Sequence, residues 1–310
     1  MSSDPHIPPP QGRAVILSTA KDPETVSITG AGRTLPPQSP VPVPATPSAP
    51  PAASTDKDAQ PGHVYLVGAG PGNPDLLTLR AHQLLTSATL ILADGLISPE
   101  ILALANPAAR TVSVAKRCGE HRITQAEIHA LTIKGARNGD SVLRLKSGDP
   151  LIFGRAGEEI AALRSAHIAF EIVPGITAAF AAAASLQTPL TDRTSASKLI
   201  LATAHHAANK PDLDPNPQPI WQGPLPTDAT LVLYMPGPNL ETLAHDLIRS
   251  GIAPATPVTA ISRASTPHEH THTTTLQHLR SANTGPAPVL LLIGDAIQPA
   301  THVPNPPALP

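Results

Sequence analysis

Cysteine and aromatic residues are scarce in this sequence. Cys118 is the single cysteine among 310 residues, and phenylalanine, tryptophan and tyrosine together make up 2% of the chain. One cysteine cannot form an internal disulfide or a zinc site built from several thiolates, so we expect a protein of the reducing cytoplasm. So few aromatic rings argue against a surface on which the bases of a nucleic acid stack.

Excess charge and long apolar segments are missing too. The formal net charge is -2 at pH 7, so the chain lacks the basic excess that attracts nucleic acid. No apolar run approaches the length of about 20 residues that a membrane-spanning helix needs. The first residues do not combine a charged segment with an apolar one, as secretion signals do. We therefore expect neither a nucleic acid nor a membrane as a partner.

Proline, by contrast, is abundant and unevenly distributed. The chain has 39 prolines, concentrated in residues 36–62, 209–226 and the segment after Gln298. Segments of Pro, Ala and Ser cannot bury enough apolar surface to offset the entropy lost on ordering. A strand could form within residues 14–28, but nothing nearby would cover it. We predict a disordered extension at 1–62 and a disordered tail at 299–310.

Strand and helix patterns alternate through the remaining residues. Apolar residues at helical spacing mark four segments, which are separated by short apolar runs typical of buried strands (helices in 75–88, 124–139, 157–168 and 177–187). This alternation predicts a largely parallel sheet, whereas the later part is richer in strands. The sequence thus indicates an α/β protein with one domain at 63–186 and a second at 187–298.

The first strand of this body leads into a loop that contains Gly68, Gly70 and Gly72. A dinucleotide-binding turn has the spacing G-x-G-x-x-G, in which the last glycine packs the helix against the strand. Here position 73 is Asn, and Pro74 follows, a residue suited to the first turn of a helix. The loop is therefore not predicted to hold the pyrophosphate of a dinucleotide.

Five loop motifs follow the strands in a fixed order, at the carboxyl ends where ligands bind in such sheets. They are "GAGPGNPDLLTL", "ADGLISP", "AKRCGEH", "RLKSGDPLIFGRAGEE" and "VPGITAA", in residues 68–79, 93–99, 115–121, 144–159 and 173–179. In this order and spacing they resemble the tetrapyrrole methylase family. The resemblance covers essentially all of residues 63–298.

The resemblance implies a fold and an activity. It implies two α/β domains of the tetrapyrrole methylase type, with S-adenosyl-L-methionine (S-adenosylmethionine) in the cleft between them and no metal. The glycine loop would then be a tight turn at the floor of that cleft, where glycines permit close approach of the backbone. The implied reaction is the double methylation of uroporphyrinogen III to precorrin-2, for sirohaem and cobalamin synthesis. A homodimer is implied as well.

The resemblance also implies a catalytic pair. Methyl transfer from a sulfonium to a pyrrole carbon needs in-line alignment and a group that takes up the released proton. Asp94 matches the proton acceptor of the family pattern, and Lys116 matches its proton donor. Both follow directly on predicted strands. The alternative is that Asp94 caps a helix and Lys116 is merely solvated.

Binding residues are assigned in the same way. Backbone groups of a loop and of a helix start, with several packing contacts, would bind the cofactor (Ser147, Gly148 and Asp149; Thr177 and Ala178; Pro71, Ile152, Met235 and Ala264). The substrate carries eight carboxylates, so arginines in or beside the motifs are candidates for its recognition. These are Arg117, Arg122, Arg155 and Arg193, each of which could instead form an ordinary surface salt bridge.

The sequence departs from the family pattern at several positions. Gly95 replaces a common Arg, and Ser147, Ala204 and Ala264 replace glycines. Ser147 is tolerable only with a negative φ. Two alternatives therefore stay open: a sister methylase acting on a later corrin precursor, and a degenerate protein that binds cofactor or tetrapyrrole without turnover.

Two further features favour ordinary structure over chemistry. His268, His270 and His272 alternate and could share one face of a strand, but neither a carboxylate nor a cysteine completes a metal site. The pair His205 and His206 is interpreted likewise. Cys118 lies beside Lys116, yet no base with an orienting partner suggests a nucleophile.

Overall fold

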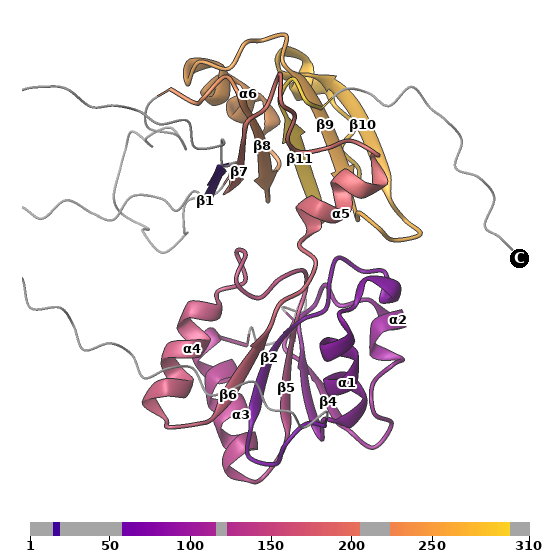
Figure 1. The fold of residues 1–310 in the computed structure, drawn as a ribbon, viewed down its shortest axis with the longest axis vertical. Helices are drawn as coiled ribbons and strands as arrows, with labels where there is room; N and C mark the ends of the chain where they lie inside the picture. Colours follow the sequence, from indigo (N-terminus) through magenta and orange to yellow (C-terminus); the bar gives the residue numbers. More distant parts are fainter. Residues whose placement is uncertain (1–14, 19–57, 116–122, 205–223, 298–310) are drawn as a thin grey trace, which may run out of the picture.

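The computed structural model describes residues 15–18, 58–115, 123–204 and 224–297, which form two lobes, each built on its own sheet (Figure 1). The sheet of the first lobe has the strand order β4-β3-β5-β2-β6, and every pair of neighbours is parallel. Its strands are β2 (Val64–Gly68), β3 (Leu90–Ala93), β4 (Arg110–Ser113), β5 (Val142–Lys146) and β6 (Phe170–Val173). The predicted parallel sheet is therefore confirmed.

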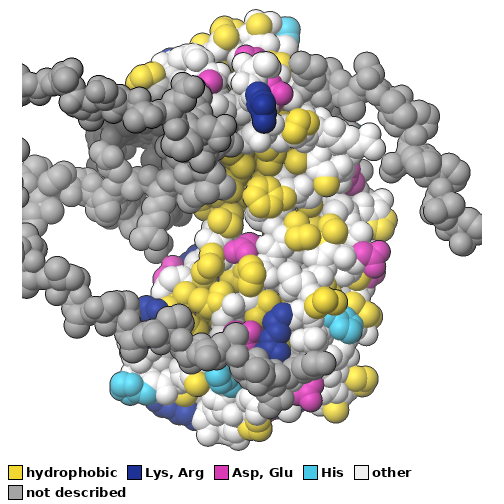
Figure 2. Space-filling model, viewed as in Figure 1, with side chains coloured by type: hydrophobic (Ala, Val, Ile, Leu, Met, Phe, Trp, Pro, Cys, Tyr) yellow, Lys and Arg dark blue, Asp and Glu magenta, His cyan; other side chains and the backbone are white. Residues whose placement is uncertain are grey.

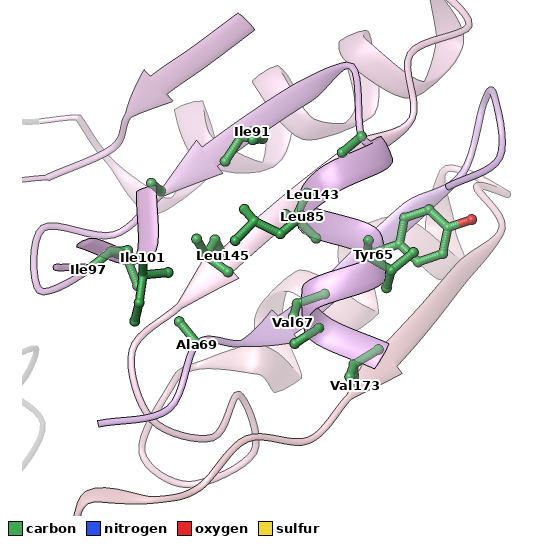
Figure 3. Close-up of a cluster of buried hydrophobic side chains, with 14 residues drawn as sticks. Tyr65, Val67, Ala69, Leu85, Ile91, Ile97, Ile101, Leu143, Leu145 and Val173 are labelled. Atoms are coloured by element: carbon green, nitrogen blue, oxygen red, sulfur yellow. The ribbon is translucent and has the colours of Figure 1, made fainter. Parts of the chain in front are cut away.

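Helices cover both faces of this first sheet. Helices α1 (Leu79–Ser87) and α2 (Pro99–Leu102) lie on one face, and α3 (Gln125–Arg137) and α4 (Ala156–Ser165) lie on the other. A short 3-10 helix, η1 (Pro74–Leu76), precedes α1 in the chain. Because side chains alternate along a strand, Tyr65 and Val67 pack towards α1 (Figure 3), whereas Val64 and Leu66 pack towards α3 and α4.

The sheet of the second lobe is mixed and has the order β1-β7-β8-β11-β9-β10. Only β7 and β8 run parallel among the pairs within this sheet. Helix α6 (Leu240–Arg249) and the 3-10 helix η2 (Leu276–Ser281) cover one face, and α5 (Ala178–Ser185) covers the other. The strands are β1 (Val15–Ser18), β7 (Lys198–Thr203), β8 (Ala229–Tyr234), β9 (Pro257–Ser262), β10 (His270–Thr275) and β11 (Val289–Ile293).

Helix α5 packs on the second sheet, although the first domain expected from the sequence, 63–186, includes it. Ala179 and Ala182 are fully buried in the cluster formed by Val232 and Leu292 of the second sheet. The chain crosses between the lobes after β6, just before α5 begins (Figure 1). The cause is composition: α5 is apolar all round, so its sequence has no polar stripe to show which sheet it covers.

The N-terminal region differs in part from the expected extension. Strand β1 pairs antiparallel with the edge strand β7, and the hydrogen bonds of the body begin at Ala59 rather than at residue 63. The Ala59 N–H donates to Ser87 Oγ, and the Ala59 carbonyl accepts from Ser141 Oγ at 3.1 Å. An open sheet edge offers unpaired backbone groups to any extended segment, which accounts for β1. The expectations for residues 1–14, 19–57 and 299–310 lie outside the described residues.

Deletions of residues 1–57 and of residues 1–62 should therefore differ in stability. Among the described residues, the shorter deletion removes the β1 ladder from a sheet edge and nothing else, so we expect a small change. The longer one leaves the Ser141 hydroxyl, in a residue 2% exposed, without the Ala59 carbonyl. That costs about 1–3 kcal/mol, and each kcal/mol is worth roughly 2–4 °C in a domain of this size. Thermal unfolding checks this; equal melting temperatures would contradict it.

Among the helices in the described part of the chain, none combines the length and hydrophobicity required to cross a bilayer.

Candidate functional site

A cavity of about 740 Å³ lies between the two lobes. Figure 2 shows hydrophobic side chains gathered near where the lobes meet. Loops of both lobes line the cavity: the first contributes the loops after β2, β3 and β5, and the second contributes the loop after β9 (Pro71, Asn73, Leu96, Ser98, Ser147, Arg263, Ser265, Thr266 and His268 among others). A smaller cavity of about 250 Å³ lies where β8 begins, and no predicted site residue lines it. The interlobe cleft is therefore the candidate site.

Four glycines hold the loops beside this cleft together. An added Cβ on Gly68 would lie 2.6 Å from the Gly148 carbonyl oxygen and from the Gly175 nitrogen. Gly70 and Gly148 exchange two backbone hydrogen bonds, of 3.2 and 2.7 Å. The close approach that these glycines permit is thus between the loops after β2, β5 and β6. This answers why the first loop is rich in glycine without having the dinucleotide-binding spacing.

The loop after β5 has the backbone that the sequence requires. Gly148 has a φ of +67°, in the left-handed region that favours glycine, whereas the φ of Ser147 is negative. The departure from glycine at Ser147 therefore costs no backbone strain. Asp149 secures this loop, because its carboxylate accepts from the N–H groups of Leu151 at 2.7 Å and Gly175 at 3.0 Å.

The start of α5 is anchored by Tyr234, a residue that the sequence analysis missed. Its hydroxyl lies 2.6 Å from Thr177 Oγ1 and accepts from the Ala179 N–H at 3.1 Å. Burial raises the pKa of this hydroxyl, so it stays protonated. Gly148 faces the same helix start, since an added Cβ would lie 3.9 Å from the Ala178 nitrogen. The predicted cofactor contacts at Gly148, Thr177 and Ala178 are thereby brought together.

Several non-glycine residues around the cleft have left-handed backbones. Met235, Arg263 and Ser265 have φ values of 51°, 49° and 63°. Such conformations cost of order 1–3 kcal/mol each and cluster at functional sites. Met235 is 51% exposed directly after Tyr234, and Arg263 and Ser265 line the cavity. Two other predicted contacts, Ile152 and Ala264, pack in the hydrophobic cluster beneath α5.

Asp94 follows β3, and its Oδ1 accepts from Arg144 Nη2 at 2.5 Å. The Asp94 side chain is 32% exposed. Among the described residues, the other oxygen, Oδ2, has no hydrogen-bond partner. The N-cap of the next helix, α2, is Ser98, whose hydroxyl accepts from the Ile101 N–H. Asp94 therefore does not cap α2.

Behind Asp94 lies a buried set of charges. The side chains of Arg144, Lys146 and Glu159 are only 3–4% exposed. Arg144 Nε donates to Glu159 Oε1 at 3.0 Å, and Lys146 Nζ lies 3.0 Å from Glu159 Oε2. Burial and the neighbouring Arg144 guanidinium lower the pKa of Lys146, while Glu159 opposes that shift. Sequence signals for this set existed: two cations alternate in a buried strand, and Glu159 lies on the buried face of α4 with Ala156 and Leu163.

The departure at Gly95 has a structural counterpart. An added Cβ there would lie 2.8 Å from the Cβ of Ala115, a position where the family motif has glycine. In this chain the glycine stands in the loop after β3, at position 95, and alanine stands at position 115 after β4. The two loops can therefore still approach each other. Position 95 itself is exposed.

The predicted catalytic lysine and substrate-binding arginines differ in where they lie relative to the cavity. Lys116, Arg117 and Arg122 lie outside the described residues, as do Cys118, His205 and His206. Arg155 does not line the cavity and donates instead to Glu158, at 2.9 and 2.8 Å. Arg193 is exposed in the turn closed by Asp192 and Ala196. Arg263 and His268 do line the cavity, although neither was among the predicted substrate-binding residues.

His270 and His272 lie on one face of β10, as their alternation predicts. His270 Nε2 lies 3.1 Å from the Asn283 carbonyl oxygen. Within the described ranges, no three side chains of His, Cys, Asp or Glu lie close enough together to hold a metal ion.

Comparison with known proteins identifies relatives of the chain. Residues 63–280 match the family Tetrapyrrole (Corrin/Porphyrin) Methylases. The chain is 43% identical over 237 residues to the uroporphyrinogen-III C-methyltransferase of Paracoccus denitrificans, covering 75% of this chain and 80% of that one. It is 41% identical over 239 residues to the siroheme synthase of Nitrosococcus oceani, covering 76% of this chain but only 50% of that one. The chain thus spans half the length of that relative.

A solved structure has the same fold. The structure of uroporphyrin-III C-methyl transferase from Thermus thermophilus, complexed with S-adenyl homocysteine, aligns with a TM-score of 0.61 at 36% identity. The alignment covers 76% of this chain and 98% of that one.

Proposed function

We propose a function from the premise that this chain belongs to the family of tetrapyrrole (corrin/porphyrin) methylases: it is an S-adenosylmethionine-dependent C-methyltransferase that methylates uroporphyrinogen III twice, giving precorrin-2. The observation that carries the proposal is the placement of Asp94. Its carboxylate stands at the carboxyl end of β3, beside a cleft lined by both lobes, and does not cap a helix. The Paracoccus relative, with 80% of its length matched, supports the substrate.

The cleft fits S-adenosylmethionine by its shape and donors. A volume of about 740 Å³ is ample for a molecule of that size. Gly148, which has no side chain, faces the start of α5, where the N–H groups of a helix have no intrahelical acceptors. Ser147 and Pro71 line the same cavity. The cofactor, when bound, supplies a methyl group on a positively charged sulfur.

The residues of the chain have separate tasks in this proposal. Asp94 takes up the proton that the tetrapyrrole releases once a ring carbon has been methylated, through the oxygen that Arg144 leaves available. Lys116 is the proposed proton donor. We propose that five arginines bind the carboxylates of the substrate. Four follow from the sequence (Arg117, Arg122, Arg155 and Arg193), and the fifth, Arg263, lines the cavity. The close backbone contacts that these glycines permit hold the loops after β2, β5 and β6 together, and the proposed cofactor contacts with them.

One observation favours a second candidate function. Gly95, where the family motif commonly has Arg, removes a guanidinium beside Asp94. The absence of that charge would set this chain apart as a sister methylase that acts on a later corrin precursor.

One assay tests the proposed function against the alternatives. Purified protein is incubated with S-adenosylmethionine and uroporphyrinogen III, and the product is oxidised. A sirohydrochlorin spectrum supports the proposal. If the protein binds S-adenosylmethionine but does not methylate uroporphyrinogen III, the proposed function is wrong. A later corrin precursor then distinguishes the two alternatives, because the sister methylase would methylate it and a binding protein would not.

We also propose a cytoplasmic homodimer, as the family resemblance implies. Large apolar side chains are exposed on the monomer, among them Leu79 at 84%, Leu151 at 58% and Phe180 at 47%. Contact with a second copy would remove such surface from water. Light scattering at micromolar concentration should give twice the mass of the chain. The mass of a single chain would contradict the dimer.

A further inference from the structure

Strand alternation places the candidate catalytic carboxylate and a buried arginine on the same face. Leu90 and Leu92 pack towards α3 and α4, so the residue two positions further on, Asp94, continues that face. On the neighbouring strand, Val142 packs on the same side, and Arg144 and Lys146 follow it at the same spacing. Arg144 lies directly opposite Leu92 in the β3–β5 ladder.

The Arg144 guanidinium bridges Asp94 to the interior of the lobe. Its Nη2 donates to Asp94, its Nη1 to the Leu92 carbonyl at 3.1 Å, and its Nε to Glu159 at 3.0 Å. A planar group held at three corners has a fixed orientation. Glu159, which anchors the Arg144 guanidinium, is in turn held in place by its ion pair with Lys146.

Burying these charges is costly for the fold. Buried ion pairs lose much of their hydration, and apolar residues of similar volume often stabilise a protein at least as well. Stability alone therefore gives little reason for two cations and a carboxylate at 3–4% exposure beneath the cleft. Two of their contacts reach partly exposed groups: Gln125 Nε2 donates to Glu159 at 3.3 Å, and Arg144 donates to Asp94, the candidate catalytic carboxylate.

We infer that Arg144, anchored by Glu159, is a positioning residue that orients the Asp94 carboxylate for proton transfer. This inference rests on the proposed function, because it assigns Asp94 as the proton acceptor. Arg144 itself is 3% exposed and acts on the reaction through Asp94.

A double-mutant cycle tests this role. Single-turnover methyl transfer and S-adenosylmethionine affinity are measured for the wild type, Arg144→Lys, Asp94→Asn and the double variant. Lysine keeps the charge but cannot hold Glu159, the Leu92 carbonyl and Asp94 at once. We expect Arg144→Lys to slow transfer roughly ten-fold or more, as is common for coupled neighbours. In the Asp94→Asn background the same change should alter the rate less than about two-fold, with cofactor affinity unchanged in both.

The matched control is Arg80→Lys. Arg80 forms a two-bond pair with Glu171 in the same lobe, at 3.0 and 2.7 Å, and lines no part of the cleft. We expect it to leave the rate of transfer unchanged.

The other outcomes are distinct. If Arg144→Lys slows transfer equally in the wild type and in Asp94→Asn, the positioning role is rejected, whereas the proposed function is not. An inactive wild type would reject the proposed function and the positioning role with it. If Arg144→Lys does not fold, Glu159→Gln, which loosens the anchor, replaces it in the cycle with the same expectation. Failure of both variants to fold would make the network structural and overturn the inference.

Discussion

Asp94→Asn should slow methyl transfer by about 10²–10⁴-fold, the usual worth of a positioned general base. Asparagine has the same shape and can still accept a hydrogen bond from Arg144, but it cannot take up a proton at neutral pH. Affinity for S-adenosylmethionine should change little, because the proposed contacts are mainly backbone groups around Gly148 and Ala178. Single-turnover methylation and equilibrium binding on the same variant check both parts.

A matched control for this variant is Asp140→Asn. Asp140 also pairs with an arginine, accepting from Arg110 Nη2 at 2.6 Å, but it precedes β5 at the opposite end of the same sheet. Loss of that pair should cost stability without touching the rate. If Asp94→Asn transfers methyl groups as fast as Asp140→Asn does, Asp94 is not the proton acceptor.

The sequence predicted the first lobe because its local signals agree with one another. The alternation of apolar runs and helical patterns fixes the parallel sheet, and Thr124 and Glu127 form the capping box that starts α3. The loops that carry chemistry follow from this order, since the ends of parallel strands meet at one edge.

Other features depend on tertiary contacts that local patterns do not encode. Helix α5 has small apolar residues on every side, so nothing in its sequence points to the second lobe. The role of Tyr234 depends on a neighbour 57 positions away along the chain, Thr177. Strand β1 pairs with β7, which lies far along the chain, with Val15 opposite Leu201.

The buried charges could be predicted from the sequence only in part. Arg144 and Lys146 could be seen as alternate positions of a strand, and Glu159 as a member of the apolar face of α4. What sequence alone could not supply is that α4 crosses β5 at the height where these side chains meet.

Gly175→Ala should have the second large effect, on folding and on cofactor binding together. A Cβ at Gly175 would lie 2.2 Å from the Gly148 carbonyl oxygen and 2.8 Å from the Gly68 Cα, and neither backbone can rotate away as a side chain could. Overpacking of this kind costs about 1–3 kcal/mol or more. The loops after β2, β5 and β6 must separate, and with them the proposed cofactor contacts at Gly148 and Ala178. We expect a lower melting temperature and at least about ten-fold weaker binding of S-adenosylmethionine, which corresponds to 1.4 kcal/mol.

Gly157→Ala is the control that isolates this effect. Gly157 is exposed in α4, and an added Cβ there meets nothing within 4 Å. Because alanine favours a helix over glycine by up to about 1 kcal/mol, the melting temperature should stay equal or rise, and binding should not change. Thermal unfolding and titration with S-adenosylmethionine on both variants decide the matter. A Gly175→Ala protein as stable and as tightly binding as Gly157→Ala would mean that the three loops do not need their close backbone contact to form the cleft.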